Sequence, residues 1–172
     1  MGTQIKKTTD DARRATLHDI VAKSRAVMLL SQGANQAIDG RPMSVVKQDA
    51  DGTIYLVTSV DSKKVDELSK QPKGSLSIAN GAGFALISAD IRVSQERSLI
   101  DELWQDSWKI WFPDGKSDTS IALLIAQPIE ATYWEGGLGH GISYLFRAVK
   151  ARVTGHELET KPGDEEKIDF RR

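Results

Sequence analysis

Residues 53–68 read TIYLVTSVDSKKVDEL, and the expected fold can be built outward from them. The first half alternates β-branched, aromatic and small residues, which predicts a half-buried strand that ends at Ser59. Asp61 or Ser62 can cap a helix, and apolar residues follow at helical spacing as far as Gln71. The stretch therefore predicts a strand that leads, within three residues, into a short helix.

Two lysines, Lys63 and Lys64, fall in the first turn of this predicted helix. The helix dipole is positive there, so each exposed cation should cost about 0.3–1 kcal/mol, with no local compensation in the sequence. An anion bound to the free N–H groups and both ammonium groups would compensate, which predicts a phosphate site. The hydroxyls that could join it are those of Thr58, Ser59 and Ser62. The alternative is that both lysines point into water beside Asp61 and Asp66.

The composition restricts the class of protein. A chain of 172 residues is long enough for one domain with a core and short for two. The net charge of −1, with acids and bases interspersed, gives no sign of a nucleic-acid or membrane partner. The sequence contains no cysteine, no apolar signal core and no membrane-spanning run, so we expect a soluble cytoplasmic protein.

The remaining pattern predicts a mainly β (α+β) fold. Strands are expected at 25–31, 41–48, 53–59, 75–79, 84–93 and 121–134, and helices at 9–24, 62–71, 95–112 and 142–153. Six strands with turn-rich joins and few helices favour a six-stranded antiparallel split β-barrel with flanking helices. We expect this domain to occupy residues 1–155, followed by a frayed polar tail at 156–172.

Three segments carry more specific expectations. Trp104, Trp108 and Trp111 share one stripe of the predicted 95–112 helix, and such a stripe is more often core than a ligand platform. Pro128 interrupts the last strand and predicts a bulge or an edge. The glycine-rich segment 136–141 matches neither the dinucleotide fingerprint nor a P-loop, so it is interpreted as a connector.

The chemistry of the chain is limited by its three histidines, His18, His140 and His156. None lies in a setting that suggests a hydrolytic triad or a metal site, so we expect no metal and identify no catalytic residue. What remains is the cationic, hydroxyl-rich corner around residues 58–64, with Arg41 at the rim of the neighbouring strand and abundant tryptophan. A phosphate at one end and a flat ring at the other describe flavin mononucleotide (FMN) better than a sugar phosphate.

The same residues resemble a known family. Residues 58–64 read TSVDSKK, and residues 41–43 read RPM at the start of the neighbouring strand. This pattern is similar to the FMN site of the pyridoxamine phosphate oxidase-like split barrels. The segment WFPDG at 111–115, with Glu102-Leu103-Trp104, Asp118 and Tyr133-Trp134, closely resembles the bacterial general stress protein branch. The similarity covers about residues 10–155.

The resemblance implies a homodimer with two flavin sites at the subunit interface, each built from both chains. The implied site residues are Arg41, Pro42, Met43, Val57, Thr58, Ser59, Ser62, Lys63, Lys64 and Trp111. Ser62 and both lysines would hold the phosphate, Arg41 would add a charge-assisted bond, and backbone groups of the two strands would meet the flavin or its ribityl chain. Trp111 would touch the ring or the interface, with core packing as the alternative.

The resemblance is incomplete at the C-terminus. The true oxidases carry Trp-Arg and Arg-x-His residues that hold the substrate phosphate, whereas this chain has Gly155-His156-Glu157 and a polar tail. Oxidation of a pyridoxamine phosphate is therefore not expected. Three hypotheses remain: an FMN-binding stress protein (FAD being possible) with or without oxidoreductase turnover, a flavin-sequestering or flavin-sensing module, and a haem-binding split barrel that uses His140 or His156.

Overall fold

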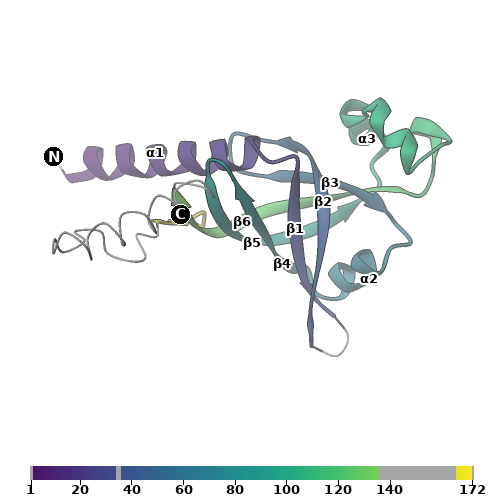
Figure 1. Cartoon of the computed structure of the whole chain (residues 1–172), viewed down its shortest axis with the longest axis horizontal. Helices are drawn as coiled ribbons and strands as arrows, with labels where there is room; N and C mark the ends of the chain where they lie inside the picture. The colour runs from purple at the N-terminus through teal and green to yellow at the C-terminus, as the bar shows by residue number, and fades with distance from the viewer. Residues whose placement is uncertain (1, 34–35, 136–165, 172) are drawn as a thin grey trace, which may run out of the picture.

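The structure is a computed structural model that describes residues 2–33, 36–135 and 166–171 (Figure 1). The elements of this part of the chain are α1 (Gly2–Ala22), β1 (Ala26–Gln32), β2 (Ile38–Gln48), β3 (Ile54–Ser59), α2 (Lys63–Lys70), β4 (Lys73–Asn80), β5 (Gly83–Ser94), α3 (Arg97–Leu103), the 3-10 helices η1 (Asp106–Ile110) and η2 (Gly115–Ser117), β6 (Ile121–Glu135) and β7 (Glu166–Asp169). The predicted helix at 142–153, the glycine-rich connector, His140 and His156 lie outside the described residues.

Six antiparallel strands close into a barrel. Their order is β3-β2-β1-β4-β5-β6, and β3 also pairs with β6, which joins the two ends of the sheet. The prediction of a six-stranded antiparallel split barrel with flanking helices is confirmed. Figure 1 shows α1 along one side of the barrel and α2 and α3 on the opposite side.

The continuously apolar run at residues 121–126 is buried on both faces of β6. Leu124 and Ala126 belong to the barrel core, whereas Leu123 and Ile125 pack on a second cluster outside the barrel that includes Trp108. A strand covered on both faces has no polar face, which explains why this run lacks the alternation of β5. The segment at 97–117 therefore packs as an apolar cover over the outside of β3 and β6.

Pro128 produces the predicted irregularity in β6. Ser88 of β5 pairs with Glu130 and Ala89 pairs with Pro128, so Ile129 is the extra residue of a bulge. The carbonyl of Ile129 accepts a hydrogen bond of 2.9 Å from the backbone N–H of Phe170. The bulge thus provides an acceptor for the C-terminal segment.

The single helix predicted at 95–112 is wrong in its second half. Trp104 and Gln105 have extended backbone angles, so α3 ends at Leu103 and η1 begins a new helical phase. Trp108 is buried and lies edge-on to Trp104 at 5.4 Å, whereas Trp111 is 57% exposed. The common stripe of three tryptophans does not form, because the extended residues rotate Trp111 away from the other two.

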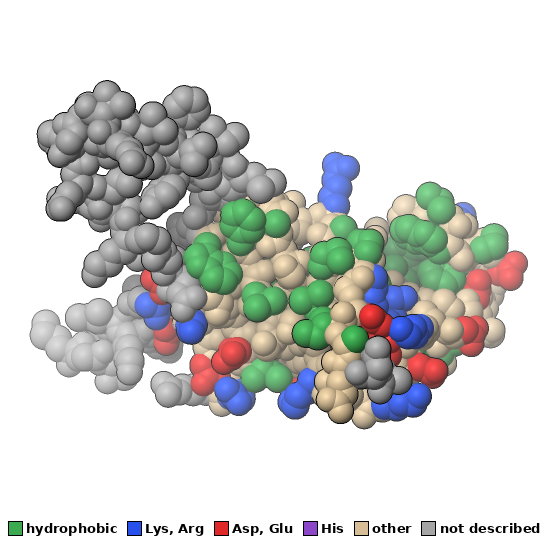
Figure 2. Space-filling view, turned by 60° about the horizontal axis from the view of Figure 1, so that its bottom comes forward, with side chains coloured by type: hydrophobic (Ala, Val, Ile, Leu, Met, Phe, Trp, Pro, Cys, Tyr) green, Lys and Arg blue, Asp and Glu red, His purple; other side chains and the backbone are tan. Residues whose placement is uncertain are grey.

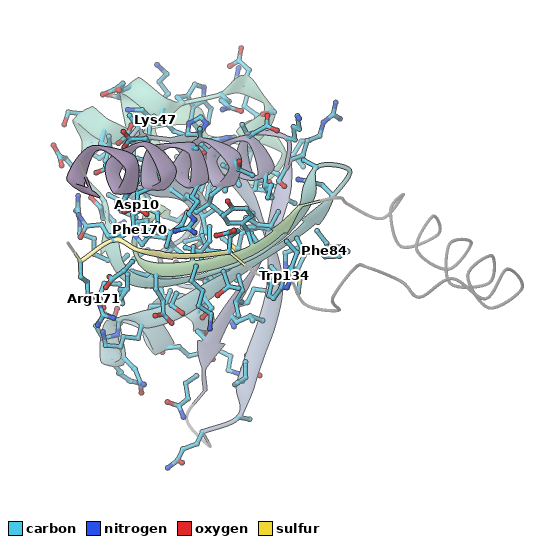
Figure 3. All side chains as sticks on the ribbon, turned by 90° about the vertical axis from the view of Figure 1, so that its left-hand side faces the viewer. Asp10, Lys47, Phe84, Trp134, Phe170 and Arg171 are labelled. Atoms are coloured by element: carbon cyan, nitrogen blue, oxygen red, sulfur yellow. The ribbon has the colours of Figure 1, made fainter. Side chains whose placement is uncertain are left out.

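The expectation of a frayed tail is wrong for residues 166–171. β7 pairs with β6, and Ile168 is buried in the barrel core. Arg13 of α1 forms an ion pair of 2.6 Å with Glu166, and the Arg14 guanidinium lies 4.3 Å above the Phe170 ring. Figure 3 shows Phe170 beneath α1, close to the C-terminal strand. A strand as short as β7 is not recognisable in the sequence, because four residues are too few to show an alternation of apolar and polar side chains. The boundary between domain and tail at residue 155 stays a prediction.

The first helix also differs from expectation, because α1 begins at Gly2 rather than near Thr9. Its apolar face contributes Leu17, Ile20 and Val21 to the barrel core, as the spacing of these residues predicts. None of the described helices has both the length and the apolar character needed to cross a membrane.

Candidate functional site

A pocket of about 310 Å³ lies where β2 and β3 meet the start of α2 and the residues that follow η1. Its walls are formed by Pro42, Met43, Ser44, Val57, Thr58, Ser59, Lys64, Trp111 and Phe112. Seven of the ten residues named from the sequence line this pocket, although they come from four separate elements. Ser44 and Phe112 were missed, and Arg41, Ser62 and Lys63 do not line it.

The polar end of the pocket is centred on the Lys64 ammonium group. Lys64 Nζ donates a hydrogen bond of 2.9 Å to Thr58 Oγ1, which lies 3.2 Å from Ser62 Oγ. The end of β3 and the first turn of α2 therefore present one ammonium group and two hydroxyls together. Ser62 stands just outside the pocket and supports Thr58.

Lys64 is half-buried and lacks a carboxylate partner. None of the ion pairs found among the described residues includes it. Burial lowers the pKa of Lys64 below its ordinary value of 10.5, the charge of Arg41 lowers the pKa further, and the charge of Glu67 acts in the opposite direction. Because a desolvated cation without a counter-charge is costly, this arrangement favours an anionic ligand.

The N-terminus of α2 adds to this preference. Ser62 occupies the N-cap position, but its side chain makes no capping hydrogen bond, contrary to the sequence expectation that Asp61 or Ser62 would cap the helix. The first N–H groups of a helix have no acceptor within the helix, and the dipole there favours negative charge. α2 therefore begins without a side-chain cap beside the uncompensated lysine.

Lys63 points to a different environment from Lys64. Its side chain is 77% exposed, and Nζ lies 2.5 Å from Asp39 Oδ2 and 3.3 Å from Glu67 Oε1. The hydrogen bond to Asp39 is the main reason why the pKa of Lys63 is raised. The expectation that both lysines lack local compensation is therefore wrong for Lys63, because Asp39 on β2 and Glu67 on α2 supply it.

Arg41 binds the buried carboxylate of Glu67. It donates to Glu67 Oε2, to Ser31 Oγ at 2.7 Å and to the Asp39 carbonyl at 2.8 Å. Glu67 is 7% exposed, and its pKa is lowered from 4.5 to about 2, chiefly by the hydrogen bond from Ser31 and then by Arg41. This partner of Arg41 could not be predicted from the sequence, because only the folded barrel brings β1, β2 and α2 together.

The other walls of the pocket are largely apolar. Met43, Val57 and Phe112 are buried, and Phe112 packs with Val57 in the cluster outside the barrel. Trp111 forms an exposed edge of the pocket. The pocket therefore combines a cationic, hydroxyl-bearing end with an apolar wall, which suits a flat ring joined to an anionic group.

The possible metal ligands in the described part of the chain do not gather into a site. No group of three His, Cys, Asp or Glu side chains there could hold a metal ion. His18, the one histidine in that part, borders a separate small pocket beside Phe170. The pocket at Lys64 has no titratable lining residue besides the lysine itself.

Comparisons with known proteins agree with this fold. The model of the family described as "Pyridoxamine 5'-phosphate oxidase like" matches residues 12–159. A search of curated proteins found no match. Among solved structures, a protein from Clostridium acetobutylicum related to general stress protein 26 of B. subtilis is 22% identical, with a TM-score of 0.66, over 73% of this chain and 90% of that chain.

Two further solved structures are similar to this chain. The general stress FMN/FAD binding protein of Xanthomonas citri is 26% identical with a TM-score of 0.61, and the match covers 76% of this chain and 90% of that protein. A pyridoxamine 5'-phosphate oxidase-related, FMN binding protein of Nostoc punctiforme is 15% identical with a TM-score of 0.56, over 72% of this chain and 82% of that protein.

Proposed function

Because this chain belongs to the pyridoxamine 5'-phosphate oxidase-like family, we propose that it is a general stress protein that holds FMN in the pocket at Lys64. The observation that carries the proposal is the half-buried ammonium group of Lys64, which has no carboxylate partner within residues 2–33, 36–135 and 166–171 and lies beside the Thr58 hydroxyl. A phosphate monoester supplies the missing negative charge and accepts these hydrogen bonds.

The proposal assigns a role to each end of the pocket. Lys64, Thr58 and Ser62 bind the phosphate, and Ser59 lies close to it. The ring and ribityl chain lie along a wall formed by Pro42, Met43, Ser44, Val57, Trp111 and Phe112. The pocket volume of about 310 Å³ is at the lower end of the range of about 300–1,000 Å³ for small-molecule sites, which favours the mononucleotide over FAD.

We propose further that the chain forms a homodimer through the outer face of the sheet. Pro42, which lines the pocket, pairs with Met28, and Met28 is followed across the strands by Ser77 and Leu86. Met28 and Leu86 are exposed, and Figure 2 shows apolar side chains gathered on one sheet face with charged side chains toward its margins. The second subunit would cover this face and the open side of the pocket.

The chemistry of the site would be that of the flavin. Bound flavin accepts or donates electrons as one- or two-electron steps, and the protein supplies binding and orientation. Among the residues that the structure describes, no carboxylate or histidine lines the pocket and could act as a general acid or base. An FMN-dependent oxidoreductase and a flavin-sequestering or flavin-sensing module therefore remain two forms of the same proposal. A cytoplasmic location stays a prediction.

Titration of the purified chain with FMN, followed by flavin fluorescence, tests the proposal. Saturable binding at micromolar or lower concentration, weaker for riboflavin, is the expected result, and absence of binding would refute it. The absorbance spectrum of the protein as purified separates flavin from haem. Reduction of bound FMN by a nicotinamide cofactor, followed by reoxidation over many turnovers, would favour the enzyme over the module.

A further inference from the structure

One corner of the barrel holds three cations and two carboxylates next to the pocket. Arg41 and Lys63 each contact Glu67, Lys63 also contacts Asp39, and Lys64 faces the pocket. If all five groups are ionised, the cluster has a net charge of +1, because three positive charges meet two negative ones. The arrangement of the partners places this excess charge on Lys64.

We propose that Glu67 is a specificity-determining residue that binds Arg41 and Lys63 and leaves Lys64 as the cation offered to the ligand. The inference rests on the proposed function, because it concerns how strongly this pocket selects a phosphorylated flavin. Glu67 does not line the pocket. It acts through the two cations that it contacts, and Asp39 is the second carboxylate partner of Lys63.

The geometry makes this neutralisation effective. Glu67 is buried on α2, accepts a 2.7 Å hydrogen bond from Ser31 of β1 and is bonded to Arg41 of β2. The Arg41 guanidinium also binds the Asp39 carbonyl and Ser31 Oγ, so both of its terminal nitrogens are occupied. The carboxylate is buried and has three partners, Ser31, Arg41 and Lys63, so it stays ionised.

The electrostatic influence of this corner reaches the pocket. The charge of Arg41 lowers the pKa of Lys64, and the charge of Glu67 raises it, so both groups act on the ammonium group at the phosphate end. Loss of the Glu67 charge would make the net charge of this corner more positive by one unit, and the electrostatic potential at the phosphate end would become more positive. FMN, which carries a phosphate, responds to this change, whereas riboflavin, which is neutral, does not.

The variant Glu67→Gln tests the inference through the ratio of two dissociation constants, that of riboflavin over that of FMN. We expect the ratio to rise about three- to tenfold, which is the size of effect that one unit charge produces across a partly screened site of intermediate dielectric constant. A purely structural role would weaken both ligands alike and leave the ratio unchanged. An unchanged or lower ratio overturns the inference.

The exposed neighbour Asp66 provides a matched control. Asp66→Asn removes the same charge one residue earlier on α2, but Asp66 faces solvent and does not line the pocket. Solvent screening should keep the ratio within about twofold of its original value. A rise as large as that of Glu67→Gln would show that any charge on α2 acts this way and would contradict a special role for Glu67.

A second variant covers the case in which Glu67→Gln fails to fold, because it leaves the Arg41 charge buried and unpaired. Arg41→Met combined with Glu67→Met removes the pair together, and such replacements of buried pairs by apolar residues are often tolerated. If Glu67 keeps Arg41 from the ligand, the double variant retains the original ratio within about twofold. A fall of more than about fivefold would mean that Arg41 binds the phosphate, which overturns the inference.

Failure of this inference and failure of the proposed function give different results. If the unaltered chain binds neither FMN nor riboflavin, the proposed function fails. If the unaltered chain binds FMN and the Glu67 variants leave the ratio where it was, the flavin site stands and only the role of Glu67 is refuted. Thermal unfolding of the variants without flavin measures their structural cost separately.

Discussion

Replacement of Lys64 by alanine should weaken the binding of FMN far more than that of riboflavin. Lys64 is the half-buried cation of the pocket, and it has no carboxylate partner among the described residues. A hydrogen bond to a charged group contributes about 1.5–3 kcal/mol, and each 1.4 kcal/mol corresponds to a factor of ten. The dissociation constant of FMN should therefore rise by about 10- to 150-fold.

The control for this prediction is the adjacent lysine. Lys63→Ala removes an equal charge from the same turn of α2, but Lys63 is 77% exposed and already bound to Asp39 and Glu67. We expect its effect on FMN binding to stay below about threefold. Calorimetric titration of both variants with FMN and with riboflavin makes the comparison.

Two results would refute the reasoning about Lys64. One is an FMN dissociation constant that Lys64→Ala leaves within about twofold of the original. The other is an equal loss for FMN and riboflavin, which would show that the variant damages the pocket as a whole rather than its phosphate end.

Three other features of the structure can be tested directly. Leu86→Asp places a charge on the exposed sheet face, so light scattering should show dissociation of the proposed dimer; an unchanged mass would exclude this face. Ionised Glu67, with its pKa lowered to about 2, contributes stability that is present above pH 4.5 and is lost as pH falls toward 2. In urea unfolding, the free energy of unfolding should therefore fall more steeply with decreasing pH in the unaltered chain than in Glu67→Gln. The same pH dependence in both proteins would contradict this. Phe170→Ala removes the ring under Arg14 and should destabilise the chain by up to about 3 kcal/mol in denaturant unfolding, whereas no change would show that the contacts of the Phe170 ring add nothing.

The sequence was most informative where a residue was unfavourable for its predicted local structure. Lysine in the first turn of a helix indicated an anion site, and Lys64 does lie in a pocket with Thr58. The same rule did not separate Lys64 from Lys63, because Asp39, one partner of Lys63, lies on β2 and is distant in the sequence. Glu67 is only four residues from Lys63 on α2, so that ion pair could have been expected from the helical spacing. Asp39 and Glu67 compensate one lysine and leave the other.

Arg41 illustrates the second limit of sequence reasoning. Its position on this strand beside Pro42 was predicted, but β2 begins at Ile38 rather than at Arg41, and the partner Glu67 was not predicted. The burial of Glu67 depends on how α2 packs against β1 and β2, and no local pattern encodes that packing. Trp111 shows a related limit, because two extended residues were enough to change its helical phase and bring it to the edge of the pocket.

A crystal structure of the chain grown with FMN would show whether Lys64 binds the flavin phosphate. We expect the phosphate within about 2.7–3.2 Å of Lys64 Nζ and of the Thr58 hydroxyl, with the ring along Met43 and Trp111. A flavin bound at another surface, or a phosphate that contacts Lys63 while Lys64 remains without an anion, would contradict it.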